Sequence, residues 1–392
     1  MRTHSTAFIF VLFDGMAAKQ IPKDDSSSLE STCSSEYEFP VAPRRQIRKL
    51  PRRALDWKID YLSTLGVYYD ANATDLSNFV SVLKDRGDIQ FHGLDRLPEI
   101  RQKLLQCTED CWKFSFDFDK EHGQGIPGEI QQTQNAMKEF EENKDNLETR
   151  LQTEESEESK SRRRTNPLLQ SGEDFKSIFY RWRTNLIDFW TYFSMILVRW
   201  WKPRQKEGRF THLLMAFSKI CLLYPEPGKM YPESICIRGV DVRGTPAVRF
   251  VTLPTTTPPT VGSFLQLIVV TEVKQCNALK GSYNAETFTY KNGSEEALGQ
   301  HGIQLLMERD SSFFRPNVVG ILCIGTKIIF TYLDINQEHY EELLEKSKEI
   351  NGTNKARISY TRPFDYMEVR DRHKILELFF WFGFVQSKVN RN

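Results

Sequence analysis

Leu265-Gln-Leu-Ile-Val-Val-Thr-Glu-Val-Lys274 is the stretch of sequence on which the fold depends. Its apolar, β-branched centre is continuous, which is typical of a strand buried on both faces in the middle of a sheet. Two charged residues, Glu272 and Lys274, end the run, and residues two apart on a strand point to the same side. An acid and a base at the end of a core strand cost desolvation energy unless they pair with each other or hold a metal. The stretch therefore predicts a central strand with a candidate polar site at its end.

The segments around this strand alternate between helical and strand periods. Helical patterns cover residues 175–201, 211–223, 294–309, 337–350 and 368–385. Strands are expected at 235–238, 247–253, 318–324 and 327–333, with Gly325-Thr326 as a type II′ hairpin turn between the last two. The order from Thr211 is α-β-β-β-α-β-β, so we expect an α+β (α/β-like) fold in which a mixed sheet is flanked by helices.

Composition divides the chain into four parts. Residues 1–55 are polar and end in a basic run, so we expect a disordered basic arm. Residues 56–118 have apolar positions at helical spacing and are expected to form a small helical unit. Residues 119–170 form a charged linker, which separates this unit from a large domain at 171–392.

Charge, cysteine usage and hydropathy limit the possible functions. The 53 Lys and Arg residues nearly balance 52 Asp and Glu, which excludes a uniformly basic nucleic-acid binder but leaves room for a local basic surface. The seven cysteines show neither a CxxC pair nor zinc-ligand spacing, which favours reduced thiols in the nucleus or cytoplasm over secretion, without a disulfide-linked partner. The charge-free part of the aromatic helix, residues 189–198, is about half as long as a membrane span requires, so no membrane segment is expected.

Further polar residues can join the acid and base at the end of the central strand. Asp241 follows the first strand beside a turn, and a hairpin there can bring its carboxylate to Glu272. Gln300 and Gln304 lie one turn apart on the following helix and can face the same edge, or can form a solvent-exposed face instead. Two carboxylates can bind Mg²⁺, which keeps several waters and polarises a phosphate oxygen. Lys274 can then orient the attacking water or neutralise charge that develops on the phosphate.

This arrangement resembles the PD-(D/E)XK nuclease superfamily, the restriction-endonuclease-like fold, over roughly residues 205–335. A helix precedes three strands, an acid precedes or lies on the second strand, Glu-Val-Lys ends the third, and a glutamine-bearing helix leads into a further strand pair. The resemblance implies Mg²⁺-dependent hydrolysis of DNA or RNA phosphodiesters. It implies Asp241, Glu272 and Lys274 as catalytic residues, Asp241 and Glu272 as metal ligands, and Gln304 as a supporting residue.

The sequence departs from the family pattern at the acidic element. Val-Asp241 replaces the family's Pro-Asp, and Asp241 is expected at the end of the first strand rather than the start of the second. Glu233, in Tyr-Pro-Glu-Ser, is a rival acid. Many domains of this fold have lost catalysis, so an inactive nuclease-like module that binds nucleic acid or protein is the alternative hypothesis. A short distance between the carboxylates of Asp241 and Glu272 is what the hydrolase hypothesis requires.

Overall fold

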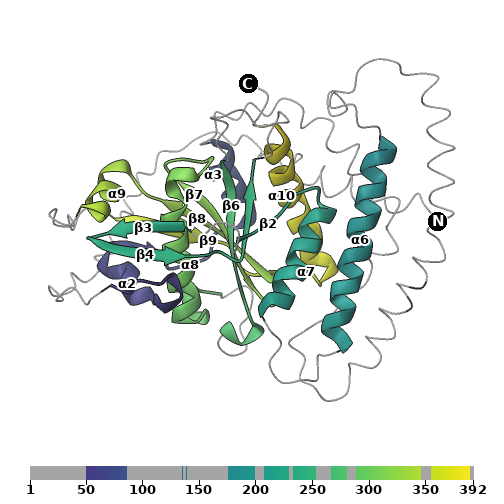
Figure 1. The fold of residues 1–392 in the computed structure, drawn as a ribbon, viewed down its shortest axis with the longest axis horizontal. Coiled ribbons are helices and arrows are strands. Elements are labelled where there is room, and N and C mark those ends of the chain that lie inside the picture. Colours follow the sequence, from purple (N-terminus) through teal and green to yellow (C-terminus); the bar gives the residue numbers. More distant parts are fainter. Residues whose placement is uncertain are drawn as a thin grey trace, which may run out of the picture.

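The structure, a computed structural model, describes residues 50–85, 135, 138, 175–198, 207–228, 233–252, 266–279, 288–345 and 355–388. Its centre is an eight-stranded mixed sheet in the order β1-β9-β8-β7-β6-β5-β2, and β10 pairs with β8. Helices lie on both sides of this sheet (Figure 1). The predicted mixed α and β class, with helices flanking a mixed sheet and a small helical unit at the N-terminal side, is confirmed.

The elements have the following bounds. The strands are β1 (Val67–Tyr69), β2 (Glu226–Pro227), β3 (Glu233–Ile237), β4 (Val240–Gly244), β5 (Val248–Val251), β6 (Leu267–Lys274), β7 (Val318–Ile324), β8 (Lys327–Asp334), β9 (Ala356–Tyr360) and β10 (Phe364–Asp365). The α-helices are α2 (Ile59–Thr64), α3 (Leu76–Asp85), α6 (Phe175–Val198), α7 (Glu207–Ile220), α8 (Glu295–Met307), α9 (Gln337–Leu344) and α10 (Val369–Lys388). Short 3₁₀ turns are η1 (Ala54–Asp56), η6 (Cys276–Ala278), η7 (Tyr290–Asn292) and η8 (Arg309–Ser311).

Strand β6 is the buried central strand that the sequence predicts. It pairs antiparallel with β5 and parallel with β7, and every residue before Lys274 is buried. Because β6 and β7 run in the same direction, the chain has to cross over between them, and α8 makes this crossing. The end of β6 therefore lies close to the beginning of α8, which places the polar residues of both elements together.

Two hydrophobic clusters hold the layers together, one on each face of the sheet. Helices α6, α7 and α10 supply one cluster, in which Phe217 of α7 packs edge-on against Phe379 of α10 with ring centroids 5.5 Å apart. Helices α2, α8 and α9 supply the other, together with the β3–β4 pair. Figure 1 shows the same division, with α6, α7 and α10 on the side away from α2 and α9.

Strands β3 and β4 form a separate two-stranded hairpin rather than part of the main sheet. Ile237 pairs with Val240, and the two residues between them, Arg238 and Gly239, have φ values of +54° and +76°. Two positive φ values in a two-residue loop define a type I′ turn, which reverses the chain tightly. The strand predicted at 235–238 is therefore one arm of this hairpin, and β5 is the first of the predicted strands that joins the main sheet.

The N-terminal unit is built into the domain. Strand β1 extends the sheet by pairing with β9, and α2 packs on α8. The contact depends on two glycines of α8, because a Cβ at Gly299 would lie 2.6 Å from the nitrogen of Lys58 and a Cβ at Gly302 would collide with Leu62. The close approach of the two backbones therefore holds α8 between the N-terminal unit and the sheet.

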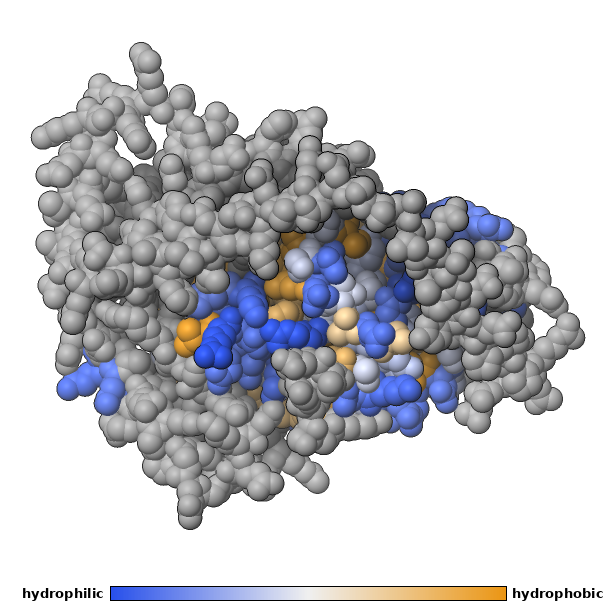
Figure 2. Space-filling model, turned by 180° about the vertical axis from the view of Figure 1, so that it is seen from behind, coloured by the Kyte–Doolittle hydropathy of each residue, from blue (hydrophilic) through white to orange (hydrophobic). Residues whose placement is uncertain are grey.

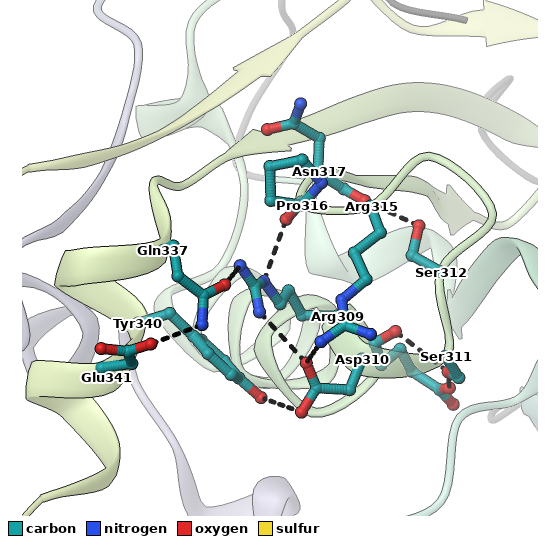
Figure 3. Close-up of polar contacts among 11 residues, drawn as sticks. Arg309, Asp310, Ser311, Ser312, Arg315, Pro316, Asn317, Gln337, Tyr340 and Glu341 are labelled. Carbon is teal, nitrogen blue, oxygen red and sulfur yellow. Dashed lines mark hydrogen bonds and ion pairs between the residues drawn. The ribbon is translucent and has the colours of Figure 1, made fainter. Parts of the chain in front are cut away.

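A buried arginine fixes the other end of α8 (Figure 3). Arg309 is 1% exposed, and its guanidinium donates to the carbonyl of Pro316 at 3.2 Å and to the side chain of Gln337. It also pairs with Asp310 at 3.1 Å and stacks on the ring of Tyr340 at 4.3 Å. These contacts connect the end of α8 to the loop before β7 and to α9, so the helix is anchored at both ends.

Figure 2 shows hydrophilic residues over much of the described surface that is visible from behind, with apolar residues between them. Leu55 and Met195 are the most exposed large apolar side chains among the described residues, at 62% and 54%. No helix within the described ranges is long and apolar enough to cross a membrane. The predicted basic arm up to residue 49, residues 86–118 of the predicted helical unit, and the predicted linker apart from residues 135 and 138 lie outside the described residues.

Gly299→Ala tests whether the N-terminal unit depends on this close contact. The added methyl group has to displace the Lys58 backbone, so we expect a loss of about 1–3 kcal/mol in the free energy of unfolding. Gly208→Ala in α7 is the matched control, because a Cβ there meets nothing within 4 Å. Urea denaturation of both variants measures the difference. Equal stability of the two variants would contradict the tight packing of α2 on α8.

Candidate functional site

The polar residues at the end of β6 form one connected cluster with α8. Lys274 Nζ lies 2.8 Å from Glu272 Oε1, and the Gln300 amide nitrogen donates to the same oxygen at 2.8 Å. The Gln304 amide nitrogen donates to Glu272 Oε2 at 2.7 Å. Lys274 in turn donates to Gln300 Oε1 at 2.8 Å, so Glu272, Lys274 and Gln300 close a three-membered ring of contacts. The two glutamines, one turn apart on α8, therefore both point to the sheet rather than to solvent.

Glu272 is buried, with 2% exposure, and burial is the main reason that its pKa is raised. The charge of Lys274 and the hydrogen bonds from Lys274 and Gln304 oppose this shift because they stabilise the ionised form. The negative charge of Glu207 raises the pKa slightly further. Burial therefore disfavours the ionised form of Glu272, whereas Lys274 and Gln304 stabilise it.

Glu207 is the acid of this cluster that the sequence analysis missed. It is the first residue of α7, and its carboxylate lies 3.4 Å from Lys274 Nζ. Glu207 is 43% exposed and Lys274 is 13% exposed, so this side of the cluster opens to solvent. The one available sequence signal is an acidic residue in the first turn of the helix before the strands, which is also a common helix-stabilising position. That signal does not by itself distinguish a site residue from a cap.

The structure places Asp241 elsewhere. Asp241 lies on β4 in the separate hairpin, is 51% exposed, and pairs with Arg243 at 2.9 Å. Neither Asp241 nor Glu233 is among the groups that influence the pKa of Glu272. Glu233, the rival acid, contacts Arg249 at 3.0 Å. The type I′ turn is the physical reason, because it returns β4 along β3 and keeps both acids on the hairpin.

The start of β5 lies beside the end of β6. Val248 pairs with Thr271, and the Ala247 N–H donates to the Thr271 carbonyl at 3.0 Å. The segment that enters β5 is therefore fixed next to the residue that precedes Glu272.

His301 is a buried, uncharged residue near Lys274. It is fully buried, and one ring nitrogen contacts the hydroxyl of Thr331 at 2.7 Å. Burial, together with the nearby charge of Lys274, lowers the pKa of His301 to about 3. The imidazole therefore stays uncharged at neutral pH and adds no second cation to the site.

The cluster contains two carboxylates, and no group of three or more His, Cys, Asp or Glu side chains within the described ranges is arranged to hold a metal ion. Glu207 and Glu272 both reach the ammonium of Lys274. Gln304 adds an amide oxygen that is buried and has no hydrogen-bond partner among the described residues. The chemistry available at this point is therefore carboxylate, amide oxygen and ammonium.

Lys274→Met tests the electrostatic account of the cluster. The substitution leaves Glu272 buried without its cation, so we expect a loss of about 3–5 kcal/mol in the free energy of unfolding at neutral pH. The pKa of Glu272 is raised in the folded state, so the folded protein binds this proton more tightly than the unfolded chain does. The resulting contribution to the free energy of unfolding is fully present below the unfolded-state pKa and is lost as the pH rises through the folded-state pKa. The deficit of Lys274→Met should therefore be smaller at pH 5 than at pH 8. Urea denaturation at both pH values measures it.

The double variant Glu272→Gln, Lys274→Met is the matched control. It removes both charges, so we expect it to be more stable at pH 8 than Lys274→Met alone and to lose the difference between the two pH values. Additive losses that are identical at both pH values would contradict a buried, coupled pair.

Comparison of the chain with protein-family models, with curated proteins and with solved structures finds no match. The resemblance to the nuclease superfamily therefore rests on the residues and on their arrangement alone. The function of the cluster has to be argued from the distances, burial and charges given above.

Proposed function

We propose that residues 171–392 form a nuclease-like domain whose site hydrolyses the phosphodiesters of DNA or RNA in the presence of Mg²⁺. One observation carries this proposal: the carboxylates of Glu207 and Glu272 come from different elements and converge on the ammonium of Lys274 at 3.4 and 2.8 Å. Two acids and a lysine at a half-open edge of a central strand are the residue types that phosphodiester hydrolysis uses. In this proposal Glu207 replaces Asp241 as the second acid and metal ligand of the site.

The donor set fits Mg²⁺ in number and kind. Mg²⁺ is usually held by one or two carboxylates and completes its shell with water and phosphate oxygens. Glu207 and Glu272 would hold the ion, and the unpartnered amide oxygen of Gln304 is a further oxygen in the same cluster. When bound, the ion would polarise the phosphate and lower the pKa of a bound water.

The residues of the chain have separate roles in this proposal. Gln300 and Gln304 orient Glu272 by donating to both of its oxygens. Gln300 also accepts from Lys274, which holds the ammonium beside the carboxylates. Lys274 supplies a positive charge that would neutralise the charge developing on the phosphate. The exposed part of Glu207 lies on the side where a substrate would approach.

A non-catalytic nuclease-like module is the second candidate, and two observations favour it. Both oxygens of Glu272 already accept hydrogen bonds from protein groups, and the side chain itself is 2% exposed. Ala247, whose N–H donates to the carbonyl of Thr271 just before Glu272, has no side-chain group that can bind a metal. In this case the cluster stabilises the fold, and the domain binds nucleic acid or protein without hydrolysing it.

Mg²⁺-dependent cleavage of plasmid DNA and of single-stranded DNA and RNA tests the proposal. We expect cleavage by the full chain, a loss of at least about 100-fold in Glu272→Gln and Lys274→Met, and a loss of similar size in Glu207→Gln. Asp241→Asn tests the assignment of the second acid, because a residue on the separate hairpin should be dispensable. Glu338→Gln on the exposed start of α9 is the matched control for the loss of one carboxylate.

The outcomes separate the two candidates. Residual cleavage that is identical in the wild type and in all site variants would overturn the hydrolase proposal. Retained binding of single-stranded nucleic acid in a gel-shift assay, without cleavage, would support the non-catalytic module. Circular dichroism of each variant ensures that a loss of activity does not reflect unfolding.

A further inference from the structure

Two free cysteines lie on the opposite side of β6 from the acidic cluster. Cys276 begins the short turn η6, two residues after Lys274, and Cys323 is the sixth residue of β7. Both belong to the hydrophobic cluster formed with α6, α7 and α10. Cys276 is partly exposed whereas Cys323 is buried, so solvent reaches one residue of the pair and not the other.

A single glycine brings the two sulfurs together. Gly325, with φ +62°, is the first loop residue of the β7–β8 hairpin, as the type II′ prediction requires. The Cys323 thiol lies 3.3 Å from the Gly325 carbonyl oxygen, and the Cys276 sulfur occupies the space that a Cβ at Gly325 would need. The Gly325 N–H also donates to the carbonyl of Lys274 at 2.8 Å. Both sulfurs therefore lie against the same glycine.

The surroundings of the thiols are polar as well as buried. The Tyr366 hydroxyl is buried, has no hydrogen-bond partner among the described residues, and lies near enough to both cysteines for their charges to contribute to its raised pKa. Burial raises the pKa of the Cys323 thiol, and the charges of Asp365 and Cys276 raise it further. Cys276 is thus near enough to affect Cys323 electrostatically, and as the accessible member it is the one that an oxidant meets first.

We propose that Cys276 and Cys323 form a reversible disulfide when the protein meets hydrogen peroxide. The Cys276 thiolate attacks a peroxide oxygen, the O–O bond breaks, and Cys276 becomes a sulfenic acid while hydroxide leaves. The Cys323 sulfur then attacks the sulfenic sulfur, the S–O bond breaks, and the Cys323 proton leaves with the hydroxyl group as water. Overall, two thiols lose two electrons and two hydrogens, and one peroxide becomes two waters.

The bond couples oxidation to the acidic cluster through the backbone. A disulfide requires the two Cα atoms to lie about 4.4–6.8 Å apart, so closing it draws η6 and the hairpin turn together. Lys274 lies two residues before η6, and its carbonyl accepts a hydrogen bond from the Gly325 N–H. A shift of η6 therefore moves the residue that pairs with Glu272. This inference does not depend on catalysis, because the covalent bond is its first readout.

Peptide mapping of the full chain under non-reducing conditions tests the proposal. Trypsin releases residues 275–280 and 310–327, each with one cysteine, so the disulfide appears as one linked species that is lighter than the sum of both peptides by two hydrogens. We expect the linked species after treatment with hydrogen peroxide and its loss after dithiothreitol. Cys276→Ser should abolish it, and Cys323→Ala should leave a sulfenic acid on Cys276 that dimedone traps.

Cys236 provides the matched control, because it is an exposed free cysteine on β3. Cys236→Ser should leave the linked species unchanged. Oxidation of Cys276 to sulfinic acid without any linked peptide, or equal oxidation of Cys276 and Cys236 without a bond to Cys323, would overturn the proposal. If Cys323→Ala fails to fold, dimedone trapping of Cys276 in the wild type at early times replaces it. Cleavage assays play no part in these outcomes, so failure of the proposed hydrolase leaves this test intact.

Discussion

The burial of one carboxylate at the end of a core strand is the constraint on which this structure depends. Glu272 sits at 2% exposure, where an isolated charge would cost several kcal/mol. Lys274 on the same strand and two glutamines from the next helix remove most of that cost by contacting both of its oxygens. These hydrogen bonds form only if α8 packs against the sheet in this position, so the buried carboxylate constrains where the helix lies.

The rest of the domain can be understood as the support for α8. Near its start, Gly299 and Gly302 allow α2 to approach α8 closely, so the N-terminal unit packs against the side of α8 that faces away from the sheet. At its end, Arg309 connects the helix to the loop before β7 and to α9. The small helical unit that looks separate in the sequence is thus part of the scaffold of the site.

The candidate site was predictable where its residues are close in sequence or share one periodicity. Glu272 and Lys274 follow from strand alternation, and the glutamine pair follows from helical spacing toward the same edge. The second acid was not predictable, because its position depends on contacts between distant segments. Asp241 stays on the type I′ hairpin of Arg238-Gly239, whereas Glu207 reaches the site from the start of α7. The local sequence carries no signal strong enough to show which of these two acids reaches the site.

The sequence by itself determined the central strand, the helices around it and the turn at Gly325, because apolar periodicity and glycine conformations act over a few residues. The tertiary structure alone decided which carboxylate meets Lys274, and that Cys276 and Cys323 flank one glycine. The physical reason is that strand register and helix docking are set by the packing of the whole core. A displacement of one residue in that packing would replace every one of these neighbours.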